Sequence, residues 1–145
     1  MNKFIKALAR HELALTRVKS LGRQIGEAVS KCPIDIRAMS GEEPAGEYHK
    51  LWVDGGKHTK THLWQAFQHL EPSDCGYGMV HLDADGIADS LSEGSSYECQ
   101  HCLRAWELIC ERKEAKADLG RARLSIRALG RQAVKLMEAE QCDQS

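Results

Sequence analysis

The stretch that decides the fold is residues 99–108, CQHCLRAWEL, in which a C-x-x-C pair opens a long run of helical periodicity. Cys99 and Cys102 have the spacing with which a tight turn directs two thiolates at one zinc ion. Both thiolates would lie at a helix N-terminus, where the helix dipole favours negative charge. The pair supplies half of a four-ligand site, so the remaining ligands must come from distant segments.

The sequence that follows predicts one helix over residues 101–139. Apolar and small residues recur at alternating steps of three and four, which is typical of a helix-helix seam, and Arg112 is the exception. The seam positions are Ala105, Leu108, Arg112, Ala115, Leu119, Ala122, Ile126, Leu129, Ala133 and Leu136. Four helical glycines suggest close approach of two backbones, which would offset their low helix propensity: Gly22, Gly26, Gly120 and Gly130.

A second seam predicts a helix over residues 3–31. Its positions are Phe4, Leu8, His11, Leu15, Val18, Gly22, Ile25 and Val29. Pro33 ends this helix, because the residue before a proline is disfavoured in the α region. Antiparallel pairing of the two helices would place Cys32 beside Cys99 and Cys102.

These patterns predict a mainly α fold, a long antiparallel helical hairpin with a coiled-coil-like stem and a small inserted head. Residues 1–32 and 99–139 form the stem, 33–98 an α+β head stabilised by zinc at the junction, and 140–145 a polar tail. Within the head, we expect strands at Tyr48–Val53 and Met79–Leu82 and helices at Thr59–Leu70 and Ile87–Leu91. Pro72 should end the first of these helices.

Six cysteines and no export signal favour metal binding over disulfides. We expect Cys32, Cys99 and Cys102 to bind one structural Zn²⁺, with Cys75 as the fourth ligand because Gly76 permits a tight bend. His81, His49 and His101 are the alternatives for that fourth position. Of the other cysteines, Cys110 is expected to be a buried apolar side chain and Cys142 an exposed thiol.

Other site chemistries fit the sequence less well. A redox C-x-x-C usually follows a strand in a βαβ unit, which is missing here. Asp83 and Asp85 begin like a calcium loop, but positions 87 and 94 carry no ligand, so an aspartate cap on the 87–91 helix explains them better. A metal-dependent nuclease using His58, His62 and His81 is the remaining catalytic alternative, although it lacks the H-E-x-x-H signature.

Charge is unevenly spread over a chain whose formal net charge is −1. Residues 1–32 and 99–137 each carry a net +5, whereas residues 33–98 carry −8 and 138–145 carry −3. After Asp118 the second helix has no acidic residue before Glu138, so its cations lack i,i+4 partners. A basic stripe is therefore expected to contact a partner or nucleic acid: Arg112, Lys116, Arg123, Arg127 and Arg131.

The run from Cys99 to Lys113, continued by Leu119 to Arg131 (LGRARLSIRALGR), resembles small accessory proteins of tailed bacteriophages and prophages. The resemblance covers about 35 residues at the C-terminal end. It implies a phage-encoded, non-structural protein that binds and inhibits host machinery, including nucleic-acid-handling and antiviral defence complexes.

The sequence therefore favours a non-enzymatic, zinc-binding interaction protein in the cytoplasm that inhibits or redirects a host nucleic-acid-handling or defence complex. The alternative is a regulator that binds DNA or RNA directly through the basic stem. No apolar run approaches the ~20 residues of a membrane span. The second helix should outlast the first by roughly ten residues, ~15 Å at the helical rise, and this overhang could form a homodimer contact.

Overall fold

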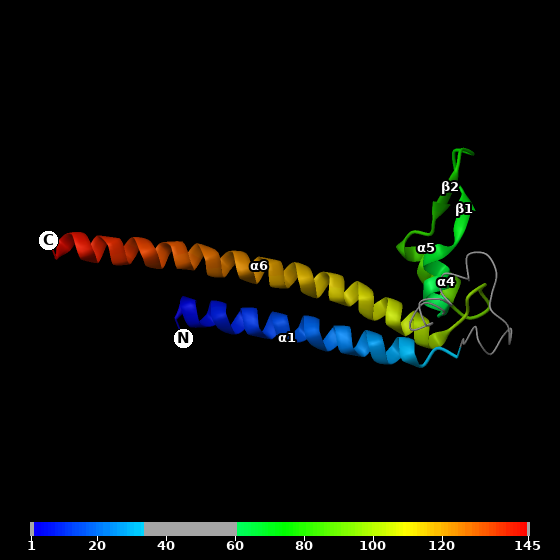
Figure 1. Ribbon diagram of the computed structural model, residues 1–145, viewed down its shortest axis with the longest axis horizontal. Helices are drawn as coiled ribbons and strands as arrows, with labels where there is room; N and C mark the ends of the chain where they lie inside the picture. Colours follow the sequence, from blue (N-terminus) through cyan, green and yellow to red (C-terminus); the bar gives the residue numbers. More distant parts are fainter. Residues whose placement is uncertain (1, 34–60, 145) are drawn as a thin grey trace, which may run out of the picture. The chain divides into compact units, whose positions relative to one another are not determined.

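The computed structural model describes residues 2–33 and 61–144, a mainly helical chain with one small sheet (Figure 1). The predicted strand Tyr48–Val53 and the candidate residues His49 and His58 lie outside the described residues. The elements are α1 (Lys3–Ser30), α4 (His62–Gln68), β1 (Leu70–Pro72), β2 (Met79–His81), α5 (Ala84–Leu91) and α6 (Gln100–Asp143).

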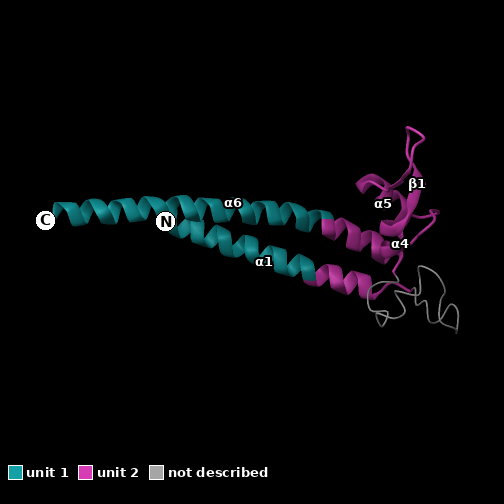
Figure 2. Ribbon diagram, turned by 45° about the horizontal axis from the view of Figure 1, so that its top comes forward, with its two compact units in different colours: residues 1–22, 110–145 teal, residues 23–109 magenta. Residues whose placement is uncertain are grey.

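The chain forms two compact units (Figure 2). Unit 1 contains Met1–Gly22 and Cys110–Ser145, and unit 2 contains Arg23–Ile109. This division differs from the predicted boundaries, because the last residues of α1 and the first of α6 belong to the same unit as the short helices and the sheet. The helix ends join unit 2 because their side chains form its core.

Unit 1 consists of two long helical segments that pack along each other. Lys3 Nζ donates a hydrogen bond to Gln132 Oε1 at 3.0 Å, and Arg17 Nη1 lies 3.5 Å from a carboxylate oxygen of Asp118. Residues early in α1 thus meet residues late in α6, and the segments are antiparallel in this unit. The core is formed by small and aliphatic seam residues: Val18, Leu21, Ala115, Leu119 and Ala122.

Both predicted long helices form, and α6 continues to Asp143, through most of the predicted polar tail. The close contact expected at four helical glycines occurs at one of them. A Cβ added to Gly22 would lie 3.5 Å from Arg112 Nε, whereas one added to Gly26, Gly120 or Gly130 would meet nothing within 4 Å. Alanine and other short seam side chains therefore set the helix spacing at the remaining positions.

Unit 2 packs the short helices α4 and α5 with the helix ends that it contains. Each short helix begins at a residue whose side chain caps it. Thr61 Oγ1 accepts a hydrogen bond from the Trp64 amide at 3.1 Å, and Asp83 Oδ1 accepts one from the Gly86 amide at 2.7 Å. The aspartate cap predicted for α5 is thus present. Aliphatic and alanine side chains fill the core: Ala28, Leu63, Ala66, Ile87, Leu91, Ala105 and Leu108.

The sheet of unit 2 is an antiparallel pair in which Leu70 faces His81 and Pro72 faces Met79. The strand at Met79–His81 was predicted, but its partner was not. The preceding helix stops at Gln68 because His69 adopts an extended conformation, so the chain enters β1 where the prediction had continued the helix to Leu70. Gly76 and Gly78, both at positive φ, form the turn between the strands.

Among the described residues, no helix combines the length and the hydrophobicity that a membrane span requires.

Candidate metal centre

Cys99 and Cys102 lie at the start of α6, and both are buried. Cys99 precedes the first helical residue, and its Sγ accepts the amide of Cys102 at 3.4 Å, so the sulfur occupies the position of a capping oxygen. The Cys99 amide donates to the Leu91 carbonyl at 3.0 Å, which ties this turn to the end of α5. The backbone thus fixes both thiols on the inner side of unit 2.

Cys32 reaches the same place from the end of α1. The last helical turn closes with a hydrogen bond from the Cys32 amide to the Val29 carbonyl at 3.1 Å, and Pro33 then prevents continuation of the helix. Cys32 is half-buried. Its position beside the C-x-x-C pair confirms the predicted meeting of these three cysteines within unit 2.

His62 is the fourth member of the cluster. It is the first residue of α4, directly after the capping Thr61, so its ring projects from the first turn of that helix. Its Nδ1 lies 3.2 Å from Cys32 Sγ. The sequence had presented His62 only as a partner of His58 in a nuclease site, and the structure assigns it to the cysteines instead.

The four ligand atoms, three Sγ and one imidazole nitrogen, all lie within 4.8 Å of one another. Ligand bonds of roughly 2.0–2.3 Å around a tetrahedral zinc ion place neighbouring donor atoms roughly 3.5–3.8 Å apart. The cluster therefore fits a single metal ion after shifts of about an ångström or less. Soft thiolates with one imidazole are a donor set that selects zinc or another thiophilic ion.

The electrostatics of the cluster are those of buried groups awaiting a cation. Burial raises the pKa of the Cys102 thiol, the Leu63 amide opposes that rise, and the neighbouring Cys32 and Cys99 add to it. Burial lowers the pKa of His62. Both directions favour the neutral forms, because a buried charge without a counter-ion is costly. A bound divalent cation would reverse this preference and hold the thiols as thiolates.

Cys75, predicted as the fourth ligand, lies elsewhere. It is exposed in the turn between β1 and β2, where its thiol contacts the Ser73 hydroxyl at 3.3 Å. The tight bend beside Gly76 exists, but it serves the strand connection. His81, exposed on β2, and His101, half-buried in the first turn of α6, are also outside the cluster.

Cys110 is exposed, so its predicted burial is wrong. It lies between the seam positions Leu108 and Arg112, and helical periodicity turns it away from α1. Cys142, predicted to be exposed, is exposed near the end of α6.

The predicted basic contact residues all lie on α6 in unit 1, but they differ in environment. Arg112 is half-buried and its Nε donates to the Val18 carbonyl at 3.4 Å, so it serves helix packing. Lys116, Arg123, Arg127 and Arg131 are exposed, and within the described part of the chain none of these four forms an ion pair. Only these four remain accessible to a partner.

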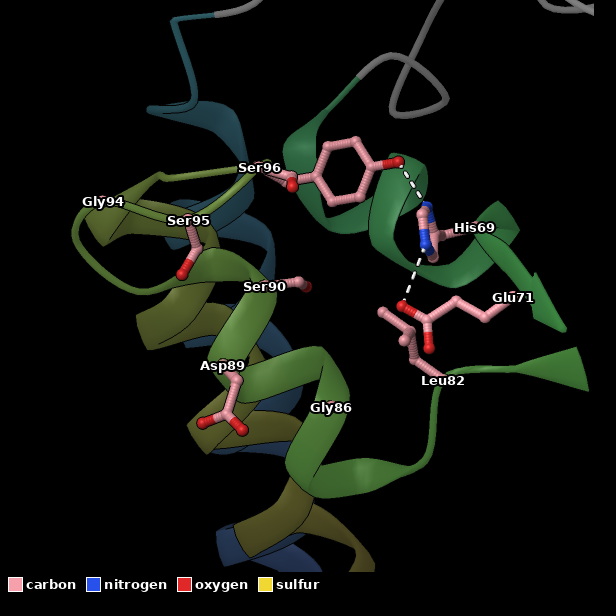
Figure 3. Close-up of a pocket in the computed structure, with 10 residues that line it drawn as sticks. His69, Glu71, Leu82, Gly86, Asp89, Ser90, Gly94, Ser95 and Ser96 are labelled. Carbon is pink, nitrogen blue, oxygen red and sulfur yellow. Dashed lines mark hydrogen bonds and ion pairs between the residues drawn. The ribbon is translucent and has the colours of Figure 1, made fainter. Parts of the chain in front are cut away.

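A second polar site in unit 2 is an open pocket of about 420 Å³ (Figure 3). His69 bridges its wall, with Nδ1 2.7 Å from the Tyr97 hydroxyl and Nε2 3.2 Å from Glu71 Oε1. These contacts tie the loop before α6 to β1. The pocket is lined by His69, Glu71, Leu82, Gly86, Asp89, Ser90, Gly94, Ser95, Ser96 and Tyr97.

Comparison of the chain with protein-family models, with curated proteins and with solved structures found no match.

Proposed function

We propose that this chain is a non-enzymatic interaction protein whose fold is held by one structural zinc ion. The support for zinc is the donor set, three cysteines and one histidine gathered around one point. Four protein ligands would leave no open coordination position, which is the arrangement of structural sites and not of catalytic ones. The metal would join the end of α1, the start of α4 and the start of α6 in an antiparallel helical hairpin with a zinc-stabilised head.

The partner surface that we propose is the acidic face of unit 2. Residues 61–98 contain seven Asp or Glu and no Lys or Arg. All seven are exposed: Glu71, Asp74, Asp83, Asp85, Asp89, Glu93 and Glu98. This one-signed charge is the observation that carries the proposal, because a surface of clustered carboxylates complements a protein site that is built to receive nucleic acid.

The proposed action is therefore occupation of the nucleic-acid-binding site of a host complex, which would inhibit or redirect that complex. The predicted phage origin and cytoplasmic location belong to the same proposal. Thiolate ligands suit a reducing compartment, where cysteines stay available to metal.

The test is affinity capture from host extract with competition. Proteins retained by the zinc-loaded chain should elute with added DNA or RNA and should be lost when Asp74, Asp89, Glu93 and Glu98 are changed to their amides. A matched control changes Glu111, Glu114, Glu138 and Glu140 of unit 1 to Gln, and it should retain the same proteins. Retention that ignores both nucleic acid and the unit 2 changes would reject the proposed surface.

A second candidate is direct binding to DNA or RNA through α6. It is favoured by Arg123, Arg127 and Arg131, which are exposed, recur at steps of four and lack acidic partners in the described residues. Binding of labelled duplex should weaken with salt, and a triple Gln variant should reduce the slope of log K against log salt by up to roughly three contacts. No binding at low salt would remove this candidate.

A further inference from the structure

We propose that the free end of unit 1 binds a second copy of this chain, with the end of α6 of each copy lying in a basic groove of the other. The proposal does not depend on the zinc site or on the acidic face of unit 2. It rests on an unpaired helix end, a groove of matching chemistry and two helix termini that carry charges of the wrong sign.

The unpaired helix end is the part of α6 beyond Gln132. Gln132 contacts Lys3, the first residue of α1, and α6 continues to Asp143. The extension is visible beside the N-terminus in Figure 1 and has no residue of α1 opposite it. Val134, Leu136 and Met137 are 53–60% exposed there.

The seam continues into this extension but changes character. Its steps of four and three run from Ala133 to Leu136 and then to Glu140 and Asp143. Residues at this spacing share one face of a helix. The face that would have met α1 therefore presents one large apolar side chain followed by two carboxylates.

The complementary surface is a groove of about 440 Å³ between α1 and α6 in the same unit. Its floor includes Ala7, Ala128 and Leu129, and Lys3, Lys6 and Arg10 line it from α1. Residues 3–10 contain no Asp or Glu. Within the described residues, Lys6 and Arg10 form no ion pair.

The spacing of the two surfaces agrees. Placed in the groove of a second copy, the end of α6 would run parallel to α1 of that copy. Glu140 and Asp143 would then follow Leu136 by four and seven residues, as Lys6 and Arg10 follow Lys3 by three and seven. Both sets span about 10 Å at the helical rise. Leu136 would cover the apolar floor, and the two carboxylates would face Lys6 and Arg10.

Helix dipoles favour the same pairing. The first turn of α1 has no acidic residue although cations stabilise a helix poorly there, and the last turn of α6 has no basic residue. Each terminus would receive the missing charge from the other copy. Because each chain carries both surfaces, two copies related by a two-fold axis satisfy both contacts and close the assembly.

The test is sedimentation equilibrium of the full zinc-loaded chain over a range of concentrations and salt. We expect a dimer whose dissociation constant rises with salt. Each of two variants, Glu140→Lys with Asp143→Lys and Lys6→Glu with Arg10→Glu, should raise that constant at least about tenfold. The variant that combines all four changes should restore dimerisation, since it exchanges the charges without removing a pair.

A matched control reverses Glu111 and Glu114, exposed carboxylates elsewhere on α6 in unit 1, and should leave the dimer unchanged. Circular dichroism and zinc content establish that each variant is folded. A wild-type chain that stays monomeric, or a combined variant that fails to recover, would overturn the proposal. So would a Lys6 and Arg10 variant that loses only nucleic-acid binding, because the groove would then belong to a different partner.

Discussion

The His62 ring lies 3.2 Å from the Cys32 thiol although the two residues are 30 positions apart. One belongs to the turn that ends α1 and the other to the first turn of α4. This contact closes the long loop between the two helices, and it places an imidazole where the sequence had suggested a fourth thiolate. It also separates two ligand sets that mutation can distinguish.

Replacing His62 should affect metal binding, and replacing Cys75 should not. His62→Ala removes one of four ligands, so we expect weaker zinc affinity and a lower melting temperature, because the binding free energy of a structural metal contributes to folding. Cys75→Ser is the matched control, since that thiol is exposed in the strand turn. Zinc titration against a chromophoric chelator measures both. Equal losses in the two variants would contradict the assignment.

Cysteine alkylation should follow the local environment of each thiol. The Ser73 hydroxyl lowers the pKa of Cys75, with a further contribution from the Tyr77 backbone. A lowered pKa leaves more thiolate at any pH below the ordinary value of 9.0, and thiolate is the reactive form. Cys75 should therefore react early with iodoacetamide near neutral pH, and the buried Cys102, whose pKa is raised, should react last.

Mass mapping of the alkylated peptides over time measures these rates. Ser73→Ala should slow the labelling of Cys75 without changing that of Cys142. Faster labelling of Cys102 than of Cys75 in the zinc-loaded chain would contradict the structure.

Gly120→Ala should stabilise the protein. Gly120 lies inside α6, and a Cβ added there would meet nothing within 4 Å. Alanine should therefore gain helix propensity without a clash, up to ~1 kcal/mol in the free energy of unfolding. Gly22→Ala is the comparison, because its Cβ would lie against Arg112 and the gain should be smaller. Chemical denaturation of both variants tests the difference, and a loss of stability at Gly120 would show a close contact there after all.

The cap of α5 gives a third stability test. Asp83→Ala should lower the free energy of unfolding by about 1 kcal/mol, because the Gly86 amide loses its acceptor. Asp85→Ala, one turn position later and exposed, should cost less than half of that since it removes only a favourable interaction with the helix dipole. Urea unfolding curves resolve the two variants, and equal effects would mean that the cap contributes little.

Much of the helical framework could be predicted because it rests on local patterns. Alternating steps of three and four residues located both long helices, and Pro33 located the end of the first. Antiparallel pairing then brought Cys32 to the C-x-x-C pair, so three of the four clustered residues followed from periodicity and one motif. The same reasoning could have excluded Arg112 as a contact residue, since it occupies a seam position.

The fourth ligand could not be predicted in this way, because it depends on the length and course of a loop. His62 reaches the cluster only because Thr61 caps α4 and places the histidine in its first turn. The predicted helix began two residues before Thr61, which would have put His62 on a later turn. Cys75 was attractive for its neighbouring glycine, but a glycine at positive φ serves a strand turn equally well.

The most direct test of the central claim is X-ray absorption at the zinc edge of the purified full-length chain. One zinc ion per chain should show three sulfur ligands at about 2.3 Å and one nitrogen ligand at about 2.0–2.1 Å. Four sulfur ligands would return Cys75 to the site and remove His62. A chain that contains no zinc, and gains no stability when zinc is added, would contradict the claim altogether.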